Sequence, residues 1–205
     1  SIGSILAFAA IFIGLVFIEF PNTPLWVAII ITALVGLVMG LINGIIVTKF
    51  NVHSIIVTLG TLSLYRGLVF IVSGGRQIDR NDIPLNIISF SQTSFFFSVP
   101  SILIVSFIIV LITYYIMKHT IIGREIYATG SNPIAAHLKG INVTKVTLFV
   151  FGICGMLSGI AGLFYASRFG YVNPGVTGVG IEFIVIAGVI IGGTSITGGS
   201  GSVLG

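Results

Sequence analysis

The sequence predicts an all-α integral membrane protein, a polytopic bundle of transmembrane helices with a glycine-rich last segment that is broken or re-entrant. Hydrophobic residues make up 56% of the chain and charged residues only 7%, whereas soluble domains carry about 25% charged residues. Six apolar runs approach or exceed the roughly 18 to 20 residues that cross a hydrocarbon core of about 30 Å. None alternates strictly between apolar and polar positions, so the pattern favours helices over an outer-membrane-type barrel.

The apolar runs are separated by more polar connections. In chain order they are Ser1 to Ile18, Leu25 to Thr48, Ser54 to Ser73, Val99 to Met117, Val146 to Ser167 and Ile181 to Thr197. The chain starts without a methionine inside the first run and stops without a polar tail. We therefore expect residues 1–205 to form a single transmembrane domain and to be a fragment, with N- and C-terminal parts of that domain missing.

Two spans carry glycines on one helical stripe. Gly36, Gly40 and Gly44 lie four residues apart in the second run, and Gly155, Gly159 and Gly162 form a similar stripe in the fifth. Such stripes let helix backbones approach closely where lipid provides no hydrophobic drive between helices. We expect tight helix packing at both.

The last run contains too many glycines for a plain helix. Six lie between Gly192 and Gly205, and each costs about 1 kcal/mol relative to alanine in a helix. Irregular backbone at membrane depth is tolerated only inside protein or along a cavity. We therefore expect close backbone approach beside a transport pathway at Gly192, Gly193, Gly198 and Gly199.

The charges in the loops predict the orientation. One set of loops holds five basic residues and one acid: Lys49, Lys118, Arg124, Lys139, Lys145 and Glu125. The other set holds three basic residues and four acids: Arg76, Arg80, Arg168, Glu19, Asp79, Asp82 and Glu182. Because short basic loops stay in the cytoplasm, the first set is predicted to be cytoplasmic.

Two ionisable residues are candidates for a pathway. Arg66 lies about 10 Å from the outer end of the third run. It either faces protein or water, as its depth favours, or extends its long stem to the outer headgroups. Glu182 opens the last run after a glycine-rich external turn, where it either stabilises a helix N-terminus or serves the pathway.

We find no sequence pattern for catalysis or for a cofactor. His53, His119 and His137 are scattered without a second ligand at metal-binding spacing. The glycine run lacks the Lys-Ser/Thr ending of a phosphate loop and follows an apolar run instead of a soluble strand. We therefore expect no catalytic residues, no metal, no cofactor and no nucleic-acid partner.

The most polar stretch of the chain, Gly123 to Lys145, predicts a short helix between two spans. Ser131 or Asn132 is the expected N-cap, Pro133 falls in the first turn, and Ile134 to Lys139 give one or two turns before Gly140 ends the helix. A helix this short is marginal in water. Either a partner protein covers its apolar side or it lies on the membrane surface.

Four motifs in this order resemble one family. They are SIGSI, IVTLGTLSLYRGL followed by SGGRQI, GREIYATGSNPIAAHLKGINV, and GIEFIVIAGVIIGGTSITGGSGSVLG. Through these motifs the chain resembles the membrane permeases of bacterial ABC importers for sugars, of the ribose, xylose, rhamnose and autoinducer-2 type. The resemblance covers nearly the whole chain and implies a multi-pass permease domain of the bacterial cytoplasmic (inner) membrane.

In that family, the loop that AAHLKGI resembles forms a coupling helix that docks into a groove of a cytoplasmic ATPase subunit. The resemblance therefore implies an ATPase-coupling role for Asn132, Ala135, Ala136, Gly140 and Ile141. An acid often precedes the paired alanines in the family, and this chain has Ile134 there, so an acidic contact with the ATPase is not expected.

The resemblance also implies the partners and the solute. ATP hydrolysis belongs to a separate cytoplasmic ATP-binding subunit, so the chain itself is a transport subunit without enzymatic activity. An extracytoplasmic solute-binding protein delivers a monosaccharide or autoinducer-2-like solute, and a second permease chain, identical or different, completes the pathway within the lipid bilayer. LYRG, SGGRQI and FGYVNPGVTGVGIEF look closer to the autoinducer-2 and rhamnose branches than to ribose.

Two other classes are weighed against the permease. An ion-coupled secondary transporter often places acids at the middle of the membrane, whereas Glu19 and Glu182 are expected at the ends of spans. An intramembrane enzyme needs a nucleophile with a base, or a metal motif, and neither is found.

Overall fold

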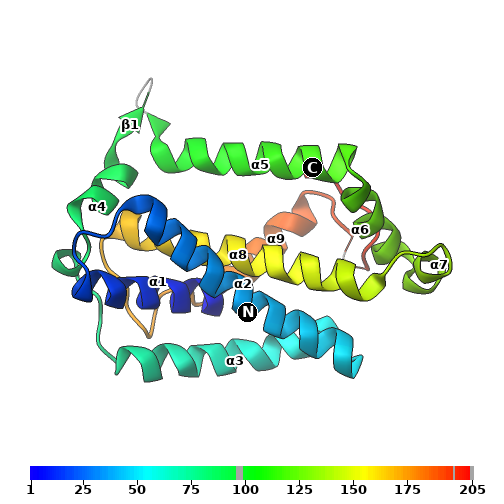
Figure 1. Cartoon of the computed structure of the whole chain (residues 1–205), viewed down its shortest axis with the longest axis horizontal. Helices are drawn as coiled ribbons and strands as arrows, with labels where there is room; N and C mark the ends of the chain where they lie inside the picture. The colour runs from blue at the N-terminus through cyan, green and yellow to red at the C-terminus, as the bar shows by residue number, and fades with distance from the viewer. Residues whose placement is uncertain (96–98, 196, 204–205) are drawn as a thin grey trace.

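The computed structural model describes residues 1–95, 99–195 and 197–203, and nearly all of the regular structure among them is helical (Figure 1). Five helices are long and apolar enough to cross a membrane: α1 (Ile2–Glu19), α2 (Leu25–Phe50), α3 (Ser54–Ser73), α5 (Ser101–His119) and α8 (Val143–Phe169). The shorter elements are η1 (Arg80–Asp82), α4 (Leu85–Gln92), α6 (Ile121–Ser131), α7 (Pro133–Leu138), α9 (Ile181–Ile191) and the hairpin of β1 (Ser94–Phe95) with β2 (Val99–Pro100). The predicted all-α membrane class is confirmed.

The first five apolar runs coincide with the five long helices to within a few residues, but the sixth does not form a span. Helix α9 has only 11 residues, which is about 16 Å at 1.5 Å per residue and too short for a hydrocarbon core of about 30 Å. It ends at Ile191 with Gly192 as its C-cap, and Gly193 follows with a positive φ of 80°. The expected break in the last segment is confirmed, and the sixth apolar run, Ile181 to Thr197, is helical only up to Ile191.

The glycine stripes of α2 and α8 pack against each other. A Cβ built on Gly36 would overlap the carbonyl oxygen of Gly155, and a Cβ on Gly159 would overlap that of Thr32. Further along, a Cβ on Gly162 would overlap the carbonyl oxygen of Leu6 in α1. The predicted close packing is confirmed, and the structure adds that the two stripes meet face to face, with α1 continuing the contact.

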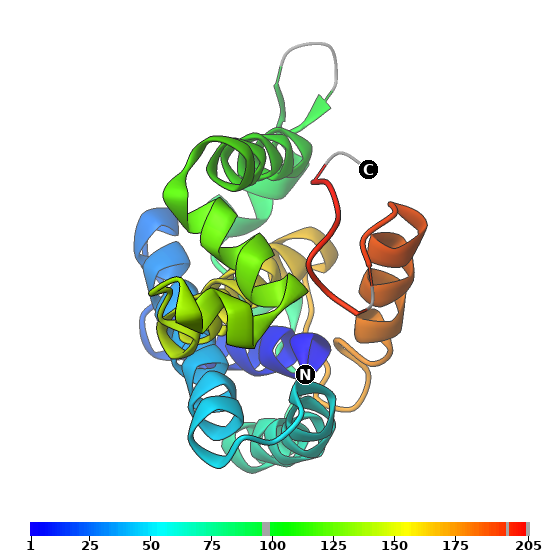
Figure 2. The same ribbon diagram turned by 90° about the vertical axis from the view of Figure 1, so that its right-hand side faces the viewer.

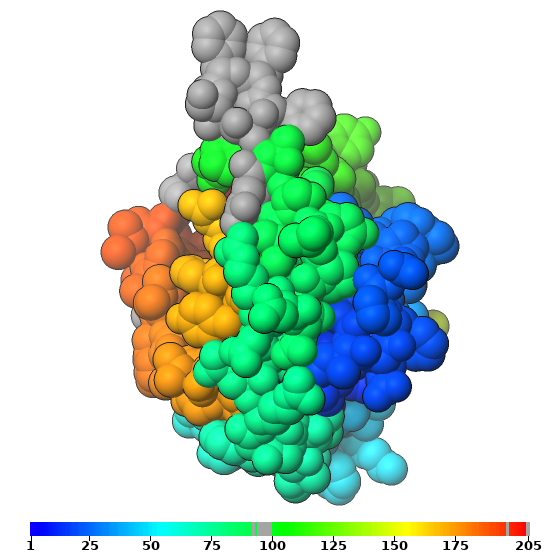
Figure 3. All heavy atoms as spheres, turned by 90° about the vertical axis from the view of Figure 1, so that its left-hand side faces the viewer, coloured from blue at the N-terminus to red at the C-terminus, as the bar shows by residue number. Residues whose placement is uncertain are grey.

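Because successive spans reverse direction, the loops gather at two ends of the bundle (Figure 1). We call the end that holds residues 20–24, 74–95 and 170–173 the outer end. The end that holds residues 51–53 and 120–142, with α6 and α7, is the inner end. Figure 3 looks onto the outer end, where the segment after α3 runs between the α1–α2 turn and the segment after α8.

A buried apolar cluster fixes the outer end. The Ile78 amide donates a hydrogen bond of 3.0 Å to the Val172 carbonyl oxygen and its own carbonyl accepts one of 2.9 Å from the Val172 amide. Both side chains are fully buried, together with Phe17 and Ile87. The loop after α3 and the segment after α8 are therefore held together although they are far apart in sequence.

Candidate functional site

The segment between α8 and α9 returns from the outer end into the depth of the bundle. The Arg66 guanidinium donates a hydrogen bond of 2.6 Å from Nη1 to the carbonyl oxygen of Thr177. Arg66 precedes Ser73, the last residue of α3, by seven positions, which is about 10 Å. The Arg66 side chain therefore faces protein, as its depth favours, and does not extend to the outer headgroups.

The same segment also touches the start of α1. Gly178 has a φ of +78°, and a Cβ there would overlap the carbonyl oxygen of Gly3, while a Cβ on Gly3 would overlap that of Gly178. Gly3 precedes Glu19, the last residue of α1, by 16 positions, which is about 24 Å. Residues 177–178 therefore lie roughly 10 to 24 Å below the outer ends of α3 and α1.

Glu182 consequently lies inside the bundle, and its expected place beside an external turn is wrong. The sequence shows a glycine-rich turn but not that this turn dips between α1 and α3. Glu182 is only 8% exposed, and its Oε2 atom is buried with no hydrogen-bond partner among the described residues. The N-cap of α9 is Gly180, and Glu182 lies in the first turn of the helix, where a carboxylate favours a helix N-terminus as expected. Burying an unpaired carboxyl oxygen is unfavourable, so the position is a strong candidate for function.

Glu182 lines a cavity of about 170 Å³. Helices α1, α2, α3, α8 and α9 all contribute to its wall, which includes the polar residues Ser1, Asn43 and Thr58. The Asn43 amide donates to the Ser1 hydroxyl over 3.0 Å, and its Oδ1 lies 3.1 Å from the Tyr65 hydroxyl. Asn43 and Tyr65 were not predicted as site residues, because each lies in an apolar run. An asparagine beside Gly44 inside such a run is nevertheless a sequence sign of a polar contact.

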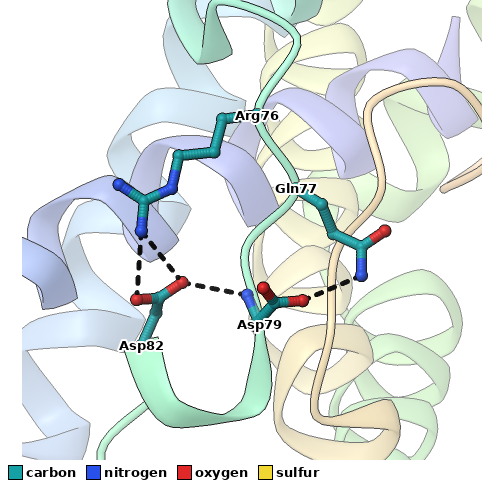
Figure 4. Close-up of polar contacts among 4 residues, drawn as sticks. All are labelled: Arg76, Gln77, Asp79 and Asp82. Atoms are coloured by element: carbon teal, nitrogen blue, oxygen red, sulfur yellow. Dashed lines mark hydrogen bonds and ion pairs between the residues drawn. The ribbon is translucent and has the colours of Figure 1, made fainter.

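A polar cluster on the outer end, part of which is drawn in Figure 4, connects the surface to Arg66 through residues 173–177. The Arg76 guanidinium lies 3.3 Å from an Asp82 carboxylate oxygen, and the Gln77 amide donates over 2.9 Å to Asp79. The carbonyl oxygen of the Gln77 side chain accepts a 2.9 Å bond from Asn173. The Asn173 backbone amide in turn donates to the Thr177 hydroxyl over 3.0 Å. An exposed ion pair adds little stability, so the main effect of the cluster is to fix the shape of residues 173–177.

At the inner end, α7 is a separate short helix with caps at both ends. The Asn132 side chain accepts a 3.0 Å bond from the Ala135 amide, so Asn132 and not Ser131 is the N-cap. At the other end, the Ile141 amide donates to Ala136 over 3.1 Å and the Gly140 amide to His137 over 2.9 Å, with φ of +83° at Gly140. This is a Schellman motif, which requires a residue that tolerates positive φ. The helix is therefore defined by its own sequence.

The two faces of α7 differ sharply in exposure. Ala136 is only 3% exposed and packs inward. Ile134 is 76% exposed and Leu138 is 82% exposed. These two lie one turn apart on the same face of the helix. The inner end thus presents a small apolar surface on a helix of fixed shape.

The glycine-rich tail after α9 lies against α6 at the inner end. A Cβ on Gly199 would meet Ser131, and a Cβ on Gly198 would lie 2.9 Å from the carbonyl oxygen of Gly130. A Cβ on Gly193, by contrast, would meet no heavy atom within 4 Å. Close backbone approach is therefore seen at Gly198 and Gly199, whereas Gly193 is needed for its backbone angle. Among residues 1–95, 99–195 and 197–203, no group of three or more His, Cys, Asp or Glu side chains could hold a metal ion.

Comparison with known proteins places the whole chain in one family. The family described as "Branched-chain amino acid transport system / permease component" matches residues 1–205. The chain is 39% identical over 211 residues to the ribose import permease protein of Haemophilus influenzae, covering 100% of this chain and 63% of the relative. It is 35% identical over 205 residues to autoinducer 2 import system permease proteins of Yersinia pseudotuberculosis and Yersinia pestis, covering 100% of this chain and 57% of each relative. It thus spans less than two thirds of their length. No solved structure matches the chain.

Proposed function

The chain belongs to the branched-chain amino acid transport system / permease component family, and from this premise we propose that it is the membrane-spanning permease of an ABC importer. In this proposal residues 1–205 form a single transmembrane permease domain in the cytoplasmic membrane of a bacterium. A separate ATP-binding subunit at the inner end hydrolyses ATP, and a solute-binding protein delivers the solute to the outer end. A second permease chain completes the pathway.

The observation that carries the proposal is the exposed apolar face of α7. Ile134 and Leu138 lie on a helix whose caps fix its shape without help from a partner. A membrane-spanning chain has little reason to present two large apolar side chains on a loop helix unless something covers them. We propose that this face docks into a groove of the ATP-binding subunit, with Asn132, Ala135, Ala136, Gly140 and Ile141 holding it in shape.

The proposed pathway runs beside α9. Transporters commonly bind their solutes near the middle of the membrane, at helices that are interrupted there. Helix α9 is such a helix, because it starts between α1 and α3 and has only 11 residues. We propose that Glu182 and the irregular segments on either side of α9, including Gly192 and Gly193, border the pathway. Arg66 supports residues 170–180 through Thr177 and does not contact the solute.

The solute is proposed to be a neutral sugar or an autoinducer-2-like molecule. The identity of 39% to a ribose import permease and of 35% to autoinducer 2 import permeases supports either choice. These values give no preference to the autoinducer-2 branch, which the motifs had suggested. D-ribose and autoinducer-2 are therefore the two probes to test first.

The test reconstitutes the full-length permease with its ATP-binding subunit and solute-binding protein in proteoliposomes and measures uptake of each probe. We expect uptake that needs ATP and both partners. Leu138→Asp should abolish binding of the ATP-binding subunit, because it places a charge in the proposed apolar contact. Leu85→Asp is the matched control, since Leu85 is 81% exposed and lies on α4 at the outer end.

Two outcomes would contradict the proposal. The first is uptake that persists without the ATP-binding subunit and stops when a proton or sodium gradient is dissipated, as an ion-coupled secondary transporter requires. The second is normal ATP-driven uptake by Leu138→Asp, which would remove α7 from the contact with the ATP-binding subunit.

A further inference from the structure

The tail that follows α9 turns back and lies along the last turns of α6. The Tyr127 hydroxyl donates a 3.0 Å hydrogen bond to the carbonyl oxygen of Gly201, and the Ser131 hydroxyl donates one of 3.3 Å to that of Gly199. Figure 2 shows the red tail between α6 and α9. We call this arrangement the α6–tail contact. Its members are Tyr127, Gly130, Ser131, Gly198, Gly199 and Gly201.

The α6–tail contact requires glycine on both sides. A Cβ on Gly130 would lie 2.7 Å from the Gly199 amide nitrogen, which is closer than packed atoms approach one another. A methyl group there must therefore push the tail away from α6. Gly198 and Gly199 have positive φ values of 91° and 77°, which side chains disfavour. The tail thus has the conformation and the small size needed to reach the helix backbone.

The α6–tail contact lies between α7 and α9, the helix that carries Glu182. Helix α6 ends at Ser131, and the next residue, Asn132, is the N-cap of α7. On the other side, the tail starts at Gly192, the C-cap of α9. Helix α7 is therefore joined to α6 through a single residue. Helix α6 in turn contacts the tail that follows α9, the helix of Glu182.

We infer that Tyr127, Gly130 and Ser131 are positioning residues that transmit movement of α7 to α9. The inference rests on the proposed function, in which the ATP-binding subunit moves α7 and α9 borders the pathway. Coupling between distant sites needs an element whose arrangement both sites bias. The α6–tail contact is such an element, because α7 displaces one of its sides and α9 carries the other. The glycine-rich tail therefore serves transmission as well as packing.

The test measures solute imported per ATP hydrolysed by the reconstituted full-length complex. Its probe is D-ribose or autoinducer-2, whichever the wild-type complex imports. Gly130→Ala should lower this ratio about tenfold or more, while the complex stays assembled and still hydrolyses ATP. Gly67→Ala is the matched control, because it adds the same methyl group to α3 at a position where a Cβ meets no heavy atom within 4 Å. The control should keep the wild-type ratio.

A second variant keeps the test decisive if Gly130→Ala does not fold. Tyr127→Phe removes one hydroxyl and keeps the ring, and it should lower the ratio about fivefold, as expected for one lost hydrogen bond. Tyr115→Phe is its control, since that ring lies on α5 and is 63% exposed. The inference is wrong if Tyr127→Phe imports with the wild-type ratio, or if its uptake falls only in proportion to lost assembly. Absence of ATP-driven uptake in the wild type would instead contradict the proposed function.

Discussion

The two irregular segments that flank α9 are held in place by different kinds of contact. Residues 170–180, before α9, are anchored by the Arg66 guanidinium, by the Gln77 side chain and by the buried pair of Ile78 with Val172. Residues 197–203, in the tail after α9, are anchored to α6 by two hydroxyl groups that donate to backbone carbonyl oxygens. Residues 170–180, which we call the outer segment, are therefore held by a charge and by apolar burial. The tail is held by backbone contacts between glycines.

This difference separates a fixed segment from an adjustable one. A hydrogen bond to a charged group contributes about 1.5 to 3 kcal/mol, and a neutral one about 0.5 to 1.5 kcal/mol. The outer segment also buries Val172 fully in the apolar cluster. We therefore expect the outer segment to stay in place while α9 is moved through the tail. In the proposed importer this would open the pathway from the inner end.

The largest effect is expected where the outer segment meets α1. Gly178→Ala would add a Cβ that overlaps the carbonyl oxygen of Gly3, at a φ of +78°. Overpacking costs about 1 to 3 kcal/mol and the left-handed backbone about 1 to 2 kcal/mol. We expect a loss of about 2 to 5 kcal/mol, measured as a lower melting temperature of the purified permease.

The control for Gly178 is Gly180→Ala. Gly180 has a φ of +75°, but a Cβ there would meet no heavy atom within 4 Å. It should therefore show only the backbone strain of about 1 to 2 kcal/mol. Equal melting temperatures for the two variants would mean that contact with α1 does not hold the outer segment.

A smaller effect is expected from Arg66. Arg66→Leu removes the bond to the Thr177 carbonyl oxygen, which as a charge-assisted hydrogen bond contributes about 1.5 to 3 kcal/mol. We expect it to impair uptake at a normal level of membrane insertion, while Arg66→Lys keeps part of the activity because it keeps a charged donor. Full uptake by Arg66→Leu would show that the outer segment does not need this anchor.

The five spans and the caps of α7 could be predicted from the sequence because each depends on local chemistry. A run of apolar residues of sufficient length specifies a span, and Asn132 before Pro133 specifies a helix start. Helix α6 was not predicted, because most of it lies in the polar stretch and its contact with the tail joins residues far apart in the sequence.

The surroundings of Glu182 could not be predicted for a different reason. A glycine-rich turn has the same composition whether it stays at the surface or dips into the bundle. Its depth is set by Gly3 and Arg66, which are far away in the sequence. The same holds for the tail, whose partner Gly130 lies on another helix. Glycines that reach a distant backbone give no local sign of their partner.

A still smaller effect is expected where the tail meets α6. Gly199→Ala would place a Cβ against Ser131 at a φ of +77°. We expect a loss of about 1 to 2 kcal/mol from the backbone. The tail can give way more easily than the outer segment, so the contact itself should cost less than at Gly178. Uptake should fall at normal expression. If Gly199→Ala lowered the stability more than Gly178→Ala does, the tail would be the more firmly held of the two segments.

The smallest effect is expected at Gly193, where the tail leaves α9. Its φ is +80° and a Cβ would meet no heavy atom within 4 Å, so a side chain brings strain without a clash. Gly193→Ala should cost about 1 kcal/mol and slow uptake modestly. Gly193→Asn should cost less, because asparagine tolerates the left-handed region better than alanine. If asparagine slowed uptake as much as alanine, then the space beside Gly193, and not its backbone angle, would be what transport requires, and the residue would belong with the close contacts of Gly198 and Gly199.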